Sequence, residues 1–195
     1  MRTVFDTSDP ATNPYDLLTS IVVPRPIAWI TTVGPDGVGN LAPHSFFNVA
    51  CQKPPMVSFS SVGRKDTLRN ILATGYFVVN LVSEGMEDLA NASSAPFAAD
   101  VDEADALHIP LEPSEVVPVP RVAESATSIE CRLHSSLKLG NSHLVIGEVS
   151  AITVRDDALV DGRPTMEALR PLSRLGRDEW GRPPEVMHLT RPERP

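Results

Sequence analysis

Cysteines and long apolar runs are both scarce in this chain. Cys51 and Cys131 are the only two cysteines in 195 residues, and they form neither a CxxC pair nor a metal-binding spacing. Their apolar, strand-like surroundings are typical of buried thiols. No stretch approaches the roughly 18 apolar residues that a membrane-spanning helix needs, and the opening MRTVFDTSDPATNPYD holds no signal-peptide core. The sequence therefore predicts a cytoplasmic protein with no membrane segment and no metal site.

Positive charge is also in short supply. Asp and Glu number 25 against 17 Lys and Arg, which gives a formal net charge of −8. Nucleic-acid backbones select for basic surfaces, so this balance argues against a nucleic-acid partner. An anionic ligand would instead need a local basic pocket.

Familiar catalytic and nucleotide-binding motifs are missing. The sequence contains no P-loop, no HExxH and no zinc ribbon. Gly34, Gly37 and Gly39 do not spell GxGxxG, and they lie between two predicted strands instead of between a strand and a helix. A Rossmann dinucleotide site is therefore not expected.

Proline, by contrast, is abundant. Twelve of the 19 prolines cluster at 10–26, 110–120 and 183–195, outside the apolar runs. Proline lacks an N–H group and is excluded from central strands, so these clusters mark connections and arms. The predicted organisation is an N-terminal arm (1–24), one folded domain (25–176) and a C-terminal tail (177–195).

Apolar runs predict about six strands. Gly140–Asn141 between the last two of them is a strong hairpin signal. Pro43 interrupts another, which implies an edge, a bulge or a kink facing a ligand. With two short helices at 66–74 and 83–93, hairpin-joined strands predict an antiparallel barrel with helices added. The predicted strands are 25–33, 38–50, 56–60, 76–82, 127–139 and 142–154.

The loop SSVGRKDTLRN, from Ser60 to Asn70, joins a predicted strand to a predicted helix. A helix start offers free backbone N–H groups and the positive end of a dipole, which suits a phosphate. In a second interpretation, Asp66 is an ordinary N-cap and the cations are solvated. The side chains that would add charge or hydroxyl donors are Arg64, Lys65, Ser60, Ser61 and Thr67.

Several separated stretches resemble one known family. PRPIAWITTVGPDGVGNLAPHSFFNVA, PPMVSFSSVGRKDTLRNI and YFVVNLV are similar in order and content to the flavin reductase-like family of FMN-binding split-barrel flavoproteins, as are SHLVIGEV and PLSRLG. The resemblance covers about residues 14–176. It implies a mainly β fold with short helices, a six-stranded antiparallel Greek-key split barrel. It also implies a flavin, FMN or alternatively FAD, at a homodimer interface.

The resemblance also implies a set of cofactor-binding residues. In the RKDT segment, Arg64, Lys65, Asp66 and Thr67 match the family's phosphate-binding residues, with Ser60 beside them. In NLAPHSFFN, the positions at which the family contacts the flavin ring and ribityl chain are Asn40, Ala42, Ser45 and Phe46. One of Phe46 and Phe47 is expected to fill the barrel, because neighbouring strand residues face opposite ways. Thr32 is preferred to Thr31 as the flavin-side residue.

Three further residues each admit two interpretations. Arg25, held between two prolines, would pair with a flavin or nicotinamide phosphate, or with an acidic group of a partner subunit. His143 would lie near the flavin as the catalytic residue, or simply end a strand beside a turn. Trp180 would cover a flavin, or anchor the tail to a core. The other four histidines are not assigned a role.

The expected function is NAD(P)H-dependent reduction of flavin. Reduced flavin or electrons would pass to a partner such as a flavin-dependent oxygenase. Because a flavin carries the chemistry itself, the lack of a nucleophile and base arrangement does not exclude an enzyme. The alternatives are a flavoredoxin-like electron carrier with tightly bound FMN, and a non-catalytic flavin-binding module.

Overall fold

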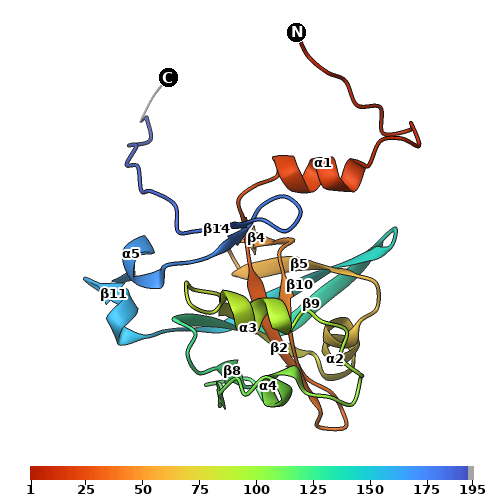
Figure 1. Ribbon diagram of the computed structural model, residues 1–195. Helices are drawn as coiled ribbons and strands as arrows, with labels where there is room; N and C mark the ends of the chain where they lie inside the picture. The colour runs from red at the N-terminus through yellow and green to blue at the C-terminus, as the bar shows by residue number, and fades with distance from the viewer. Residues whose placement is uncertain (193–195) are drawn as a thin grey trace.

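An antiparallel sheet of seven strands forms the body of the computed structural model, which describes residues 1–192 (Figure 1). Its strand order is β3-β2-β6-β9-β10-β5-β4, and every neighbouring pair is antiparallel. The fold is thus mainly β, as the sequence predicted. The strands are β2 (Ala28–Val33), β3 (Gly39–His44), β4 (Phe47–Cys51), β5 (Met56–Val62), β6 (Tyr76–Leu81), β9 (Thr127–Leu139) and β10 (Ser142–Val154).

The main sheet has one strand more than expected, because the predicted strand 38–50 is two strands. β3 and β4 lie at opposite ends of the sheet order, and Ser45 and Phe46 carry the chain across. The Ser60 N–H donates to the Phe46 carbonyl at 2.9 Å, which ties this crossing to the end of β5. The crossing brings the two sheet edges together, as in a barrel that is split rather than closed.

Pro43 can lie in β3 because its backbone nitrogen, which carries no hydrogen, faces the free edge of the sheet. The Leu41 N–H donates to the Glu103 carboxylate at 2.8 Å, so the backbone of Leu41 points away from β2. In an antiparallel pair, residues two apart point the same way, so Pro43 also faces outward and no ladder bond is lost.

The long hairpin of β9 and β10 is present with the predicted bounds. Gly140, at φ +57°, supplies the left-handed conformation of its turn. At a register shift further along β10, Gly147 lies against Phe77. A Cβ at position 147 would come within 2.3 Å of the Phe77 ring. Glycine here allows the ring to pack directly on the strand.

Apolar side chains fill both sides of β2. Ala28 and Ile30 belong to a cluster that α2 covers, whereas Trp29 packs in a second cluster with residues of α3 and α4. Phe47 packs against the first cluster, as expected for one of the two neighbouring phenylalanines. The start of α2 and the connection between α3 and α4 are therefore held on either side of the β3 edge.

Short helices and small sheets complete the fold. The helix predicted at 66–74 is present with those bounds, whereas the one predicted at 83–93 begins only at Glu87. The helices are α1 (Pro14–Ile21), α2 (Asp66–Thr74), α3 (Glu87–Ala92), α4 (Glu103–Ala106) and α5 (Met166–Leu169), with a 3₁₀ turn, η1 (Asp156–Ala158). The small strands are β1 (Arg25–Pro26), β13 (Ser173–Arg174) and β14 (Trp180–Gly181) in one sheet, β7 (Leu111–Glu112) with β8 (Arg121–Val122), and β11 (Leu159–Val160) with β12 (Arg163–Pro164).

The two thiols differ in burial. Cys131 is fully buried, and burial together with the neighbouring Glu130 raises its pKa to about 12. Cys51, at the end of β4, is only half-buried, so the prediction of two buried thiols is correct for Cys131 alone. Across residues 1–192, no helix combines the length and the apolar character needed to cross a bilayer.

Candidate functional site

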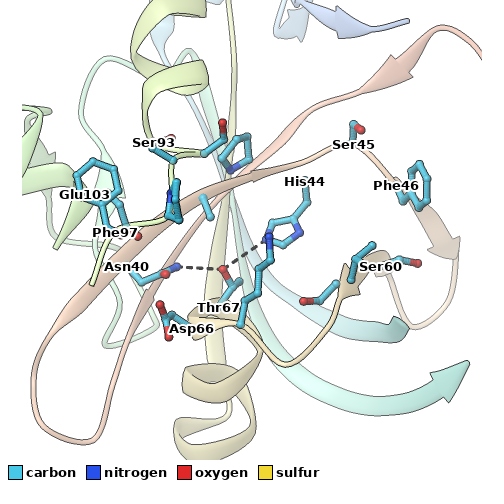
Figure 2. A pocket seen from close by; sticks show the side chains of 18 of the residues that line it. Asn40, His44, Ser45, Phe46, Ser60, Asp66, Thr67, Ser93, Phe97 and Glu103 are labelled. Carbon is cyan, nitrogen blue, oxygen red and sulfur yellow. Dashed lines mark hydrogen bonds between the residues drawn. The ribbon is translucent and has the colours of Figure 1, made fainter. Parts of the chain in front are cut away.

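A cavity of about 430 Å³ lies between β3, the start of α2 and the connection from α3 to α4 (Figure 2). Eight of the predicted cofactor-binding residues line it, from two segments some 20 residues apart in the sequence. They are Asn40, Ala42, Ser45, Phe46, Ser60, Lys65, Asp66 and Thr67. Two further lining residues are Ser61, which the sequence offered as a hydroxyl donor, and Pro43, for which a kink facing a ligand was one interpretation. The lining residues that sequence reasoning did not connect with the site are Tyr15, His44, Val62, Ser93, Ser94, Ala95, Pro96, Phe97 and Glu103.

The positive end of α2 is free of a side-chain cap. Lys65 is the N-cap residue and makes no capping hydrogen bond. Asp66 is the first residue of the helix, and its carboxylate pairs with Arg69 one turn further on. The interpretation of Asp66 as an N-cap is therefore wrong. The first-turn N–H groups remain available beside the Lys65 side chain.

A short polar chain crosses the floor of the cavity. Figure 2 shows Asn40 and His44 pointing from β3 toward Thr67. The Asn40 amide donates to the Thr67 hydroxyl oxygen at 3.0 Å, and the His44 Nε2 lies 3.4 Å from the same oxygen. Because Asn40 occupies the hydroxyl as an acceptor, the Thr67 proton is free to point toward the His44 Nε2. This arrangement suits a neutral imidazole.

His44 was left without a role by the sequence, and the structure corrects this. Burial lowers its pKa from near 6.5 to about 4, a hydrogen bond with the Ser60 backbone opposes the shift, and the Lys65 charge adds to it. The ring also packs against Phe59, with centroids 4.8 Å apart. The residue was passed over because nothing in NLAPHSFFN distinguishes a histidine on the cavity side from one in solvent.

The neutral state of His44 predicts a pH-dependent stability. The unfolded chain takes up a proton on this residue near pH 6.5, whereas the folded chain does so only near 4. Stability is therefore full above pH 6.5 and falls as the pH drops toward 4. Between pH 7.5 and 5.5, chemical denaturation should show a loss of about 1 kcal/mol attributable to this residue.

A His44→Phe variant provides the control, since it keeps an aromatic ring against Phe59 but cannot titrate. As the pH is lowered from 7.5 to 5.5, the unfolding free energy of the wild type should fall relative to that of the variant. Glu103 has a raised pKa, so its protonation increases the stability of the fold as the pH falls, opposite to the effect of His44. Both proteins contain Glu103, so its effect on stability cancels in the comparison. Parallel stability profiles for the two proteins would contradict a buried neutral His44.

Glu103 lies in the acidic run DVDEADA, and a run of this kind is most simply a solvated face. In the structure, however, Glu103 is 6% exposed, and its carboxylate accepts from the Leu41 N–H. Burial raises its pKa, and the charges of Asp102 and Asp66 push in the same direction, while its backbone hydrogen bonds oppose the shift. Its neighbour Ala104 packs in the core, which turns α4 inward.

Several predicted residues lie away from this cavity. Arg64 is exposed beside it. Thr32 is buried beneath α2, where its hydroxyl accepts from the Asn70 amide at 3.2 Å. His143 lies opposite Ser61 in the ladder between β10 and β5, near the hairpin turn. Directly opposite residues share a sheet face, so His143 lies on the same face as Ser61, which lines the cavity. His143 itself does not line the cavity.

Arg25 and Trp180 belong to a neighbouring part of the molecule. The Arg25 guanidinium donates to the backbone carbonyls of Thr19, Val22 and Leu175. Trp180 lines a second cavity of about 160 Å³. The lining residues of this second cavity are Ile27, Pro43, Ser45, Asn91, Ser94, Arg174 and Trp180. Pro43, Ser45 and Ser94 line both cavities, so the two adjoin.

The donors around the first cavity fit a ligand with a phosphate at one end and a flat ring at the other. Free N–H groups, the Lys65 ammonium and the nearby hydroxyls are the groups that bind a phosphate. Ala42, Pro43, Phe46 and Phe97 provide apolar surface elsewhere in the same cavity. Its volume lies in the range of ordinary small-molecule sites.

Comparison with known proteins agrees with this geometry. The family model described as the flavin reductase like domain matches residues 20–170. The chain belongs to the flavin reductase-like family. The matched residues include all seven strands of the main sheet and every lining residue of the first cavity except Tyr15.

Solved structures of similar proteins extend over nearly the whole chain. Nitrilotriacetate monooxygenase component B from Bacillus cereus superposes with a TM-score of 0.91 at 33% identity, covering 97% of this chain and 98% of the other. The 2-nitrobenzoate 2-nitroreductase NbaA from Pseudomonas fluorescens gives 0.89 at 32%, covering 98% and 97%. A protein with a split barrel domain from Shewanella frigidimarina gives 0.85 at 22%, covering 93% and 95%, and shows the shared fold.

Proposed function

We propose that this flavin reductase-like protein binds FMN in the first cavity and reduces it with NADH or NADPH. The observation that carries the proposal is the uncapped start of α2, with Lys65 and Thr67, at one end of a cavity that also has apolar walls. The flavin, when bound, would supply the hydride-transfer chemistry. The protein would bind it, orient it and limit its contact with water.

The phosphate end would be held by α2. The N–H groups of its first turn and the Lys65 ammonium would bind the dianion, with Ser60 and Ser61 as further donors. Asn40 and His44 would act indirectly, by fixing the orientation of the Thr67 hydroxyl. Asp66 would contribute less, because its carboxylate is already paired with Arg69.

The ring end would lie along the β3 edge. Pro43 offers an apolar face there with no N–H group of its own, and Phe46 lies beyond it at the crossing to β4. Phe97 and Glu103 close the opposite wall, as Figure 2 shows. A flat ring would thus sit between a sheet edge and a loop, with polar contacts only at its rim.

A homodimer and an oxygenase partner complete the proposal. Large apolar side chains are exposed on α1 and on the β9–β10 hairpin, and such patches are typical of interfaces. The similarity to a monooxygenase component B supports delivery of reduced flavin to an oxygenase. We place this activity in the cytoplasm. The exposed apolar side chains concerned are Tyr15, Leu18, Ile21, Leu137, Leu139 and Ile152.

The visible spectrum of the purified protein tests the proposal directly. Flavin bands are expected, either as isolated or after addition of FMN, and they should bleach rapidly when NADH or NADPH is added without oxygen. Bands that persist with both nucleotides would indicate an electron carrier instead of a reductase. A protein that binds no FMN at all would refute the cofactor assignment.

A further inference from the structure

The second cavity is too small for a flavin but has a cation and an aromatic ring in its wall. Its volume is about 160 Å³, and Arg174 and Trp180 both line it. The Arg174 guanidinium carbon lies 5.2 Å from the centroid of the Trp180 ring. Ile27 and Pro43 add apolar surface. A pocket of this size accommodates a single substituted ring, not a dinucleotide.

A second arginine, Arg25, lies next to Arg174 on the neighbouring strand. In the small sheet, Arg25 on β1 is opposite Arg174 on β13, and Arg174 is opposite Trp180 on β14. Directly opposite residues project from the same face, so the three side chains form one row across the sheet. The Arg25 guanidinium carbon is 5.9 Å from the Phe46 ring, which lines the first cavity. The row therefore links the two cavities.

These two cations have no counter-charge in the part of the chain that the structure describes. Neither Arg25 nor Arg174 has a carboxylate oxygen within 4.0 Å. Arg25 is 7% exposed, its Nε has no hydrogen-bond partner, and burial and then Arg174 lower its pKa. Five other arginines have carboxylate partners, namely Arg69, Arg121, Arg155, Arg170 and Arg182. The remaining described arginines without such a partner are all exposed to solvent, namely Arg2, Arg64, Arg132, Arg163, Arg177 and Arg191.

An uncompensated pair of cations is stabilised by an anion from outside. Two like charges side by side repel, and partial burial strengthens that repulsion because the local dielectric constant is low. In a protein of net charge −8, such a pair is a local exception. Of the two, Arg174 lines the cavity. Its Nη2 already donates to the Arg177 carbonyl, so an anion would contact the N–H donors on the other nitrogens of its planar guanidinium.

We propose that the second cavity binds a small aromatic carboxylate, with the carboxylate on Arg174 and the ring against Trp180. Arg25 does not line this cavity; it adds positive charge from its position opposite Arg174 in the small sheet. Because Pro43 and Ser45 separate this cavity from the first, the ring would lie beside the flavin in the position of an electron-transfer partner. That last point rests on the proposed function, whereas the binding itself does not.

Isothermal titration of the protein with benzoate and with benzamide tests the proposal. The two ligands share a ring but differ in charge, so benzoate should bind at least about tenfold more tightly, since a charge-assisted hydrogen bond replaces a neutral one. In an Arg174→Gln variant this preference should vanish. Arg182→Gln, which removes the same charge from an exposed side chain in the same tail, should keep it.

Tryptophan fluorescence locates the site. Benzoate should change the emission of the wild type much more than that of a Trp180→Phe variant, because the remaining Trp29 is buried and lines neither cavity. Equal binding of the two ligands, or an unaltered benzoate affinity in Arg174→Gln, would overturn the proposal. A third result would also overturn it: the wild type does not bind benzoate, and the Arg174→Gln variant no longer forms a dimer. That result would show that the two cations pair with a carboxylate of a partner subunit.

The same titrations separate this inference from the proposed function. A protein that binds no FMN but still prefers benzoate would refute the flavin site and support the carboxylate site. A protein whose flavin bleaches with NADH but that ignores benzoate would do the reverse. Thermal unfolding of each variant verifies that it is folded.

Discussion

Replacing Lys65 and Thr67 together by alanine is expected to weaken FMN binding by about 100-fold or more. The change removes the Lys65 ammonium at the free end of α2, and it removes the Thr67 hydroxyl that holds Asn40 and His44 in place. A hydrogen bond to a charged group contributes about 1.5–3 kcal/mol and a neutral one about 0.5–1.5 kcal/mol, and about 1.4 kcal/mol is a factor of ten in affinity. Equilibrium titration that follows the quenching of FMN fluorescence measures the effect.

The same loop offers a matched control for this variant. Arg64 is exposed and does not line the cavity, so Arg64→Ala removes an adjacent charge and should change the affinity by less than about tenfold. Thr67→Ser keeps the hydroxyl between Asn40 and His44 and should bind FMN almost as the wild type does. Unchanged affinity in the double variant would refute the phosphate site at α2.

Glu130→Gln is expected to destabilise the fold by about 3 kcal/mol. The Glu130 carboxylate is fully buried and accepts hydrogen bonds from three consecutive backbone N–H groups, those of Glu115 at 2.7 Å, Val116 at 2.7 Å and Val117 at 3.2 Å. It thereby fixes the proline-rich connection between β7 and β8 to the sheet. An amide in its place would present an NH₂ group to donors, leaving some of them unsatisfied.

Urea unfolding provides the measurement, and the midpoint should fall without a change in slope. Glu112→Gln is the matched control. Glu112 accepts from the Arg121 Nε at 2.7 Å, but its side chain is 45% exposed, whereas Glu130 is fully buried, so loss of the Glu112 carboxylate should cost no more than about 1 kcal/mol. Equal losses in the two variants would show that burial of the Glu130 carboxylate is not what stabilises the connection.

Local sequence signals predicted those elements that depend on neighbouring residues. The Gly140–Asn141 turn determined the hairpin, and the pattern of Leu68, Ile71 and Leu72 with Gly75 as the stop determined α2. The residues of the RKDT and NLAPHSFFN segments were assigned through the family resemblance, and each segment is a continuous stretch. The structure brings seven of these residues, together with Ser60, to the first cavity.

What the sequence could not show were contacts between distant segments. Glu103 is held by Leu41, 62 positions earlier, and an acidic run alone gives no sign of such a partner. The pairing of Arg25 with Arg174 spans about 150 residues and involves strands of two residues each, which are too short to leave a periodic pattern. The second cavity depends on that pairing and was missed with it.

The β3 edge has one further consequence, for how these molecules behave when crowded. An exposed sheet edge invites strands from other chains to add to it, and most proteins protect such edges with prolines or charges. Here Pro43 presents no N–H group, and Glu103 occupies the N–H of Leu41. The two residues that shape the ligand cavity therefore also prevent growth of the sheet into aggregates. Substituting either for ligand specificity would risk solubility as well.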